Sequence, residues 1–521
     1  MKLLYLLIFV SQVVFSQTVT LDPTFGTNGK VINSFYAGID QSGVVIIQDD
    51  MKILVCGAKD FSVAGNIYIA RYNTDGSLDT GFGTGGVVFT PLMTESGGNR
   101  IIKLLADGKI LVTSARSVSN NTNFFDFATM RYNADGSVDT TFGTNGMVQT
   151  DINGSGNYAN AIDVQSDGKI IVAGSTYLNS NTNVGTTLVR YSVDGQIDTT
   201  FGTDGKVILN LLAPNTSQFL WDIKILADDS ILLGVTTTAF ETLETLRNIA
   251  ILKISSNGAP DLTFGTNGAV VTDFGAKDIL YAIDEFQGAI YMAGYSQYPN
   301  NTMILSKYLP NGTLDTTFGI DGKVKTNKDA TSLYDGLYSM KVQSNGKILC
   351  SGWTTHGQQQ DALLIQFNAD GSIDTGFNGT GFITTDFGNL DNINFSFAVQ
   401  PDGKIVCAGW VGAGSDYDST LIRYDVTALT TNQFNAKSEF SVFPNPFANN
   451  INIRVDLAEP QNLAVDLLDG NGRKIQNLLQ DKPFSLGENV VELSMPESLS
   501  RGVYFIRISN DSSVVTLKLI K

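Results

Sequence analysis

The groups in this chain that could do acid–base chemistry are nearly all carboxylates, because the sequence contains a single histidine, His356. This residue falls in a variable segment, beside a glycine and three glutamines. A Ser-His-Asp triad or a multi-histidine metal site elsewhere in the chain is therefore excluded. We interpret His356 as a solvated loop residue and predict no catalytic residues.

Aspartates recur as pairs four residues apart in short turns. The pairs are Asp75 and Asp79, Asp135 and Asp139, Asp194 and Asp198, and Asp370 and Asp374. Two carboxylates are enough for glycoside hydrolysis, but a catalytic site is normally singular, and a pair present in most repeats indicates a structural role. We expect these side chains to bond the backbone of their own turns. Calcium coordination is the alternative, although the spacing is not that of an EF-hand; otherwise we predict no metal or cofactor.

Three aromatic residues hold matching places in successive repeats, at the end of a strand that precedes a variable loop. They are Tyr295, Trp353 and Trp410, whereas the first and third repeats have Ala58 and Ser175 there. Neighbouring aromatic side chains on the variable loops of a rigid scaffold are typical of a platform for sugar rings or a peptide. Packing between repeats is the alternative. We expect Trp221, in an innermost strand, to be part of the core.

A repeat of 54 to 63 residues must position these groups. Its mark is a Phe-Gly-type anchor after an Asp-rich turn, at Phe25, Phe82, Phe142, Phe201, Phe264, Phe318 and Phe377. In the third unit, strands are expected over 159–165, 169–174, 187–191 and 206–209, joined by Asp-Gly turns. A fixed period of this length predicts a repeat architecture, whose units bury their faces only by stacking.

The ends of the repeat array fit closure into a ring. The Lys-Ile-type strand and the Arg-Tyr-type strand each occur seven times, and the last repeat stops at Tyr424, before its turn and anchor. The chain begins with that missing piece, Leu21 to Gly26 followed by Lys30 to Ile32. We therefore predict an all-β protein whose residues 18–427 form a seven-bladed β-propeller of four-stranded blades, closed by the N-terminal strand. An open β-solenoid is the alternative.

The repeat resembles a known family. Asp75 to Gly83 reads Asp-Gly-Ser-Leu-Asp-Thr-Gly-Phe-Gly, and Gln400 to Ile405 reads Gln-Pro-Asp-Gly-Lys-Ile. These motifs are similar to those of the bacterial delta-60 repeat family, which implies a β-propeller and assigns no molecular function. The fourth unit departs most from the pattern, with Asp229-Ser230 in place of Gly-Lys.

The N-terminus has the pattern of a secretory signal peptide over residues 1–16. Lys2 precedes an apolar stretch, and we expect cleavage between Ser16 and Gln17. A membrane anchor is the alternative, but the apolar run is too short to span a bilayer. Cys56, Cys350 and Cys407 sit in equivalent strands and are interpreted as buried thiols, with a Cys350–Cys407 bridge as the alternative.

The period is lost after a linker predicted over 428–438, and residues 439–521 read as a small Ig-like β-sandwich. This tail resembles the type A C-terminal sorting domain of the type IX secretion system of Bacteroidota. The residues that carry the resemblance include Phe443, Pro444, Asn445, Pro446, Gly502, Tyr504, Lys518 and Lys521. The resemblance implies export with the type IX machinery as partner, to the cell surface or the medium. A plain Ig-like adhesion module is the alternative.

Charge and composition narrow the function further. The net charge of −17 argues against nucleic acid or an anionic membrane as partner, and no mature segment is long enough for membrane insertion. We expect a monomeric, non-enzymatic, exported binding or adhesion scaffold for a glycan or protein. A secreted polysaccharide hydrolase or lyase on the same propeller is the alternative, and a calcium-stabilised structural protein is a weaker one.

Overall fold

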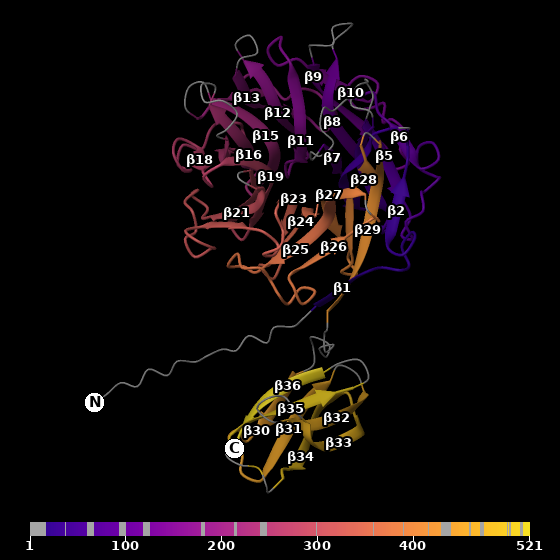
Figure 1. Cartoon of the computed structure of the whole chain (residues 1–521), viewed down its shortest axis with the longest axis vertical. Helices are drawn as coiled ribbons and strands as arrows, with labels where there is room; N and C mark the ends of the chain where they lie inside the picture. The colour runs from indigo at the N-terminus through magenta and orange to yellow at the C-terminus, as the bar shows by residue number, and fades with distance from the viewer. Residues whose placement is uncertain are drawn as a thin grey trace, which may run out of the picture. The chain divides into compact units, whose positions relative to one another are not determined.

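The protein is an all-β chain in the computed structural model, and every regular element in the part described is a strand (Figure 1). The structure describes residues 17–36, 38–59, 67–92, 101–117, 125–178, 183–212, 216–239, 247–297, 300–357, 359–388, 390–414, 416–428, 439–457, 460–468, 474–496, 499, 502–510 and 514–521. The predicted signal peptide, with Ser16, lies outside these residues. So does the predicted linker, except for Ala428, which ends a strand. No helix long and apolar enough to cross a membrane occurs in the described ranges.

The chain divides into two compact units, Thr18–Val426 and Thr427–Lys521. The N-terminal unit contains all seven repeats. Its first half comprises β1 (Gln17–Leu21), β2 (Lys30–Asn33), β3 (Asp40–Ile47), β4 (Ile53–Lys59), β5 (Ile67–Tyr72), β6 (Val87–Phe89), β7 (Ile102–Leu104), β8 (Ile110–Ser117), β9 (Phe125–Tyr132), β10 (Met147–Thr150), β11 (Asn157–Val164), β12 (Ile170–Leu178), β13 (Asn183–Tyr191) and β14 (Lys206–Leu209). The second half contains β15 (Thr216–Ile225), β16 (Ile231–Ala239), β17 (Arg247–Ile254), β18 (Ala269–Thr272), β19 (Lys277–Phe286), β20 (Ala289–Gln297), β21 (Thr302–Tyr308), β22 (Lys323–Thr326), β23 (Asp335–Val342), β24 (Ile348–His356), β25 (Gln359–Phe367), β26 (Phe382–Thr385), β27 (Asp391–Val399), β28 (Ile405–Ala413) and β29 (Asp416–Ala428).

Each repeat folds into a four-stranded antiparallel meander, such as the sheet β11-β12-β13-β14. Two of these meanders, β15 to β18 and β19 to β22, are joined into one sheet by a single parallel pairing, Arg247 with Lys277. The last sheet combines β27, β28 and β29 with the N-terminal strands, because β2 pairs with β29 from Lys30↔Ile422 to Asn33↔Ser419. Figure 1 shows the sheets following one another around a common centre, with indigo β2 beside orange β29.

The core lies between neighbouring sheets. Ile171 and Leu188 of one sheet, for example, belong to the same buried cluster as Leu233 and Leu252 of the next. The second strand of each repeat is buried along most of its length, as in β12, where a nearly continuous apolar run replaces alternation. Such a repeat cannot bury both faces alone, so the sheets must stack.

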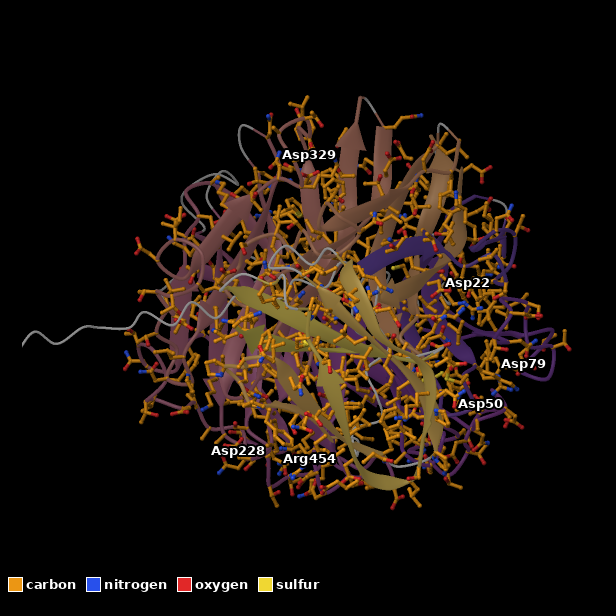
Figure 2. All side chains as sticks on the ribbon, turned by 90° about the horizontal axis from the view of Figure 1, so that it is seen from below. Asp22, Asp50, Asp79, Asp228, Asp329 and Arg454 are labelled. Atoms are coloured by element: carbon orange, nitrogen blue, oxygen red, sulfur yellow. The ribbon has the colours of Figure 1, made fainter. Side chains whose placement is uncertain are left out.

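The repeated aspartates, arginines and Phe-Gly anchors contact one another, and we call each such group of contacts a staple. In the second repeat, Asp139 accepts a hydrogen bond from Arg131 Nε at 2.7 Å and pairs with Lys109 Nζ at 3.0 Å. The Arg131 guanidinium lies 4.7 Å from the ring centre of the anchor Phe142. The backbone N–H of Gly143 then donates to Asp194 O of the next repeat, at 2.8 Å. Asp22 and Asp79, which hold the same place in their own staples, are labelled in Figure 2.

The earlier aspartate of the turn bonds its own loop at Asp75, Asp135 and Asp370. Asp75 Oδ1 accepts hydrogen bonds from the backbone N–H and the hydroxyl of Ser77, at 2.9 and 2.7 Å. This is the Asx-turn arrangement expected from the sequence. Within the described ranges, no group of three or more His, Cys, Asp or Glu side chains is placed to hold a metal ion. All three cysteines are buried free thiols, so Cys350 and Cys407 are not bridged.

The C-terminal unit consists of two antiparallel sheets around one hydrophobic cluster. Its strands are β30 (Glu439–Phe443), β31 (Asn450–Leu457), β32 (Gln461–Leu468), β33 (Lys474–Phe484), β34 (Gly487–Ser494), β35 (Val503–Ser509) and β36 (Val514–Ile520). One sheet has the order β30-β31-β34 and the other β33-β32-β35-β36. Ile453 of the first sheet and Val465 and Ile506 of the second are fully buried in that cluster.

Candidate functional site

A β-bulge interrupts the innermost strand of the repeats at a constant place. In β19, for example, the register with β20 shifts between Leu280 and Ala282, so that Tyr281 is the extra residue. The bulge residues in six inner strands are Gly43, Asn160, Trp221, Tyr281, Tyr338 and Phe395. Since the register shift falls at the same place in each strand pair, these six residues occupy equivalent positions in their repeats.

Four of the bulge residues form a continuous row that we call the aromatic arc: Trp221, Tyr281, Tyr338 and Phe395. Ring centres are 4.7 Å apart between the first two, 4.6 Å between the second and third, and 4.9 Å between the last two. All four rings are half-buried. Burial raises the pKa values of the Tyr281 and Tyr338 hydroxyls, so both stay neutral.

The arc lines a cavity of about 410 Å³. Its wall comes from β3, β7, β11, β15, β19, β23 and β27, the inner strands of the repeats. Along β27 the lining runs from Phe395 to Val399, the later half of the strand. The cavity therefore lies toward the turns that follow the inner strands, rather than at the variable loops where the sequence had suggested a site. Its volume falls in the range of small-molecule sites.

The inner strands also carry a level of charged residues, of which Lys103, Asp163 and Lys341 line the cavity. Four residues lie three positions after a bulge: Asp163, Lys224, Asp284 and Lys341. Lys103 holds the corresponding register in β7, opposite the second residue of β8. We call these five residues the charged ring. Its charges alternate along the five repeats, with Lys103 Nζ 2.6 Å from Asp163, and Asp284 shared by Lys224 at 2.9 Å and Lys341 at 3.0 Å.

The shared carboxylate stays ionised. Burial opposes the charge on Asp284, but Lys224, Lys341 and the backbone N–H of Val342 outweigh that effect and lower its pKa. Asp284 is thus in the state of a structural ion pair rather than of a general acid. Asp163 contacts the ammonium group of Lys103.

The three aromatics singled out in the sequence lie behind the arc. Tyr295, Trp353 and Trp410 are only 8%, 5% and 8% exposed. Tyr295 stacks on Tyr281 at 5.8 Å and meets Trp353 edge-on at 6.2 Å. Trp353 and Trp410 belong to one apolar cluster with Tyr338 and Phe395. They form a supporting row rather than an open platform, which is the packing alternative, and direct contact with a ligand stays a prediction.

Sequence reasoning missed most of the arc. Trp221 was expected in an innermost strand and in the core. It lies in β15, where it is half-buried, packs against a buried hydrophobic cluster and also lines the cavity. A signal was available: Trp221, Tyr281, Tyr338 and Phe395 are aligned when the repeats are superimposed. What the alignment does not show is the bulge that turns these positions toward the cavity.

In the C-terminal unit, the Phe-Pro-Asn-Pro motif is bonded to the last strand. Asn445 Nδ2 donates to Lys518 O and its Oδ1 accepts from Ile520 N, both at 2.8 Å. Gly502 and Lys521 exchange backbone hydrogen bonds at 3.2 and 3.0 Å. Tyr504 is buried in the cluster, whereas Phe443 is 40% exposed and Lys518 is exposed. The motif residues thus tie the end of the chain into the sandwich.

Two family models match the chain. The model of the secretion system C-terminal sorting domain matches residues 441–521. The model of a β-propeller domain of unknown function, DUF5122, matches residues 48–82, 105–142, 165–201, 288–318, 343–377 and 400–426. No matched segment falls in the fourth repeat, whose sequence departs most from the pattern. No curated protein matches the chain.

The structure is similar to several solved structures, of which we report three. PorZ, a surface component of the type IX secretion system of Porphyromonas gingivalis, has 11% identity and a TM-score of 0.39, with 92% of this chain and 59% of PorZ covered. A polysaccharide lyase, the PL25 ulvan lyase, has 11% identity and a TM-score of 0.46, with 75% and 95% covered. The β-propeller domain of the Trilobed protease from Pyrococcus furiosus has 11% identity and a TM-score of 0.37, with 76% and 100% covered.

Proposed function

Because the chain is a DUF5122 β-propeller protein with a type IX C-terminal sorting domain, which directs it to the cell surface or the extracellular space, we propose that it is an exported, non-enzymatic binding protein that takes a glycan into its central cavity. We further propose that the N-terminal unit is a seven-bladed propeller closed by the N-terminal strands. The C-terminal unit is proposed to be an Ig-like sandwich, which is removed from or retained on the mature protein. Adhesion or scaffolding at the cell surface is the proposed role.

One observation carries the glycan proposal: four aromatic rings from four consecutive inner strands meet at 4.6 to 4.9 Å on the wall of one cavity. Pyranose rings present apolar C–H faces, which stack on aromatic faces. The rings are held by bulges in a stacked scaffold, so little side-chain entropy is lost on binding.

The non-enzymatic part of the proposal is supported by the two carboxylates of the charged ring, of which Asp163 lines the cavity. Asp163 and Asp284 each face a lysine ammonium group within 3.0 Å. A glycosidase needs one carboxyl group with a raised pKa and a second one free to act on the sugar. An ion-paired aspartate whose pKa is lowered, as for Asp284, meets neither requirement.

The test is a glycan array probed with the full chain and with the variant Tyr281→Ala/Tyr338→Ala. The matched control is Tyr334→Ala, which removes an exposed tyrosine outside the cavity lining. We expect specific binding that the double variant loses and the control keeps, with unchanged circular dichroism spectra for all three proteins. Binding that survives in the double variant would contradict the site, and new reducing ends on incubation with a bound glycan would contradict the non-enzymatic role.

A further inference from the structure

The charged ring presents its two signs unequally to solvent. The side chains of Lys341 and Lys103 are 53% and 39% exposed, whereas those of Asp284 and Asp163 are 4% and 20% exposed. The carboxylates are thus withdrawn into the wall and the outer lysines face the open side of the ring. A ligand entering the cavity would meet ammonium groups before it meets carboxylates.

The ring is also incomplete. The register occupied by its five members continues in the two remaining repeats as Ile46 of β3, opposite Leu54, and Ala398 of β27, opposite Val406. These two uncharged residues separate Lys341 from Lys103 on that side of the cavity. Both lysines, Ile46 and Ala398 line the same cavity as the aromatic arc.

The balance of charge within the ring is positive, because it contains three lysines and two aspartates. Lys224 and Lys341 share the single carboxylate of Asp284. This local surplus of positive charge occurs in a chain whose net charge is −17. Packing does not require charged residues in this register, since neutral residues hold it in two repeats. Low-dielectric walls strengthen the field of such a group on a bound anion.

We propose that the ligand is an acidic glycan, whose carboxylate or sulfate group lies in the uncharged sector between Lys341 and Lys103 while its sugar rings contact the aromatic arc. This inference rests on the proposed glycan-binding function and specifies the substrate class of the same site. A pyranose that bears an acidic substituent matches the two levels of the cavity, one aromatic and one cationic.

The experiment compares matched pairs of oligosaccharides: uronates beside their carboxyl-reduced forms, and sulfated sugars beside their desulfated forms. Binding is measured for the full chain, for Lys341→Gln and for Lys103→Gln. Glutamine keeps a hydrogen-bond donor near the aspartates, and Asp284 retains Lys224 in the first variant. Lys206→Gln is the control, because Lys206 Nζ bonds Asp151 O and does not line the cavity.

We expect the acidic member of a pair to bind at least tenfold more tightly than its neutral counterpart. That preference should shrink with added salt and fall about tenfold in Lys341→Gln, but not in Lys206→Gln. Equal binding of both members, lost only in Tyr281→Ala/Tyr338→Ala, would overturn the acidic specificity and leave the glycan site standing. Absence of binding to every pair would overturn both proposals.

Discussion

The carboxylate of Asp22 accepts a hydrogen bond from Arg423 Nε at 2.7 Å, although the two residues are 401 positions apart. The same oxygen accepts from Lys404 Nζ at 2.7 Å, and Arg423 Nη1 donates to Thr74 O of the first repeat. The first three repeats have the same arginine–aspartate contact within one repeat, but here the carboxylate comes from the N-terminal segment. It joins the beginning of the chain to its last repeat sheet.

Removing the Asp22 carboxylate should weaken the contact between the N-terminal segment and the last repeat sheet. Asp22 is 1% exposed and the side chain of Arg423 is 7% exposed, so Asp22→Ala leaves the buried guanidinium of Arg423 without its carboxylate partner. Such a loss costs about 3 kcal/mol of the free energy of unfolding, which urea denaturation measures. Asp75→Ala, in an exposed turn, is the control and should change little. Equal midpoints for the two variants would show that the N-terminal staple does not hold the last sheet.

Asp40 should make stability depend on pH in an unusual direction. Burial raises its pKa to about 6, against the N–H donors of Tyr36 and Phe35, and Asp418 adds to the effect while Lys59 opposes it. Because the folded state binds this proton more tightly than the unfolded state, the contribution favours folding below about pH 4 and is lost as pH rises through 6. Asp40→Asn should therefore stabilise the protein at pH 8 and have no such benefit at pH 4.

The measurement is the free energy of unfolding of both proteins from pH 3 to pH 8. The staple aspartates act in the opposite sense: hydrogen bonds from Thr200 and Thr317 lower the pKa values of Asp198 and Asp315 to about 2. Their stabilisation is complete above about pH 4 and is lost as pH falls toward 2, so both proteins should lose stability there. A difference between the two proteins that does not vary with pH would refute the assignment to Asp40.

The strands could be predicted closely from sequence, because the repeat shows each element several times. In the third unit, strands expected over 159–165, 169–174, 187–191 and 206–209 are found as β11 to β14, with the two middle strands extended toward the variable loop. Turn residues and apolar runs determine these elements locally. The variable segments carry no such periodic signal, so the ends of the middle strands were the least predictable.

The candidate site could not be predicted in the same way. Strict alternation along an inner strand assigns each residue to one of two faces, and a single extra residue at the bulge changes that assignment for all that follow. Nor does the sequence show that Trp353 is covered by the neighbouring inner strand. That depends on Gly336, directly opposite Trp353 in the register, and on the fit between sheets.

Gly336 should be intolerant of even a methyl group. A Cβ atom there would lie 2.6 Å from Trp353 Nε1 and 3.1 Å from Tyr295 Cδ1, so Gly336→Ala must displace the row that supports the arc. Overpacking of this kind costs about 2 kcal/mol, and the near-ultraviolet circular dichroism signal of the tryptophans should change. Gly81→Thr is the control, since Thr141 and Thr200 hold the equivalent position in other repeats. An unchanged spectrum for Gly336→Ala would show that Trp353 does not hold the arc in place.

Asn445 should hold the sorting domain's last strand. Its side chain makes two 2.8 Å hydrogen bonds with the backbone of β36, one donated to Lys518 O and one accepted from Ile520 N. Asn445→Ala removes both, and at about 1 kcal/mol for each bond amide exchange at Ile520 should accelerate more than tenfold. Asn450→Ala, which loses only a bond to the Glu492 side chain, is the matched control. If export depends on a correctly closed final strand, Asn445→Ala should accumulate inside the outer membrane while the control is exported. Rapid exchange with normal export would separate the motif's structural role from its recognition, and normal exchange would show that the two bonds do not stabilise β36.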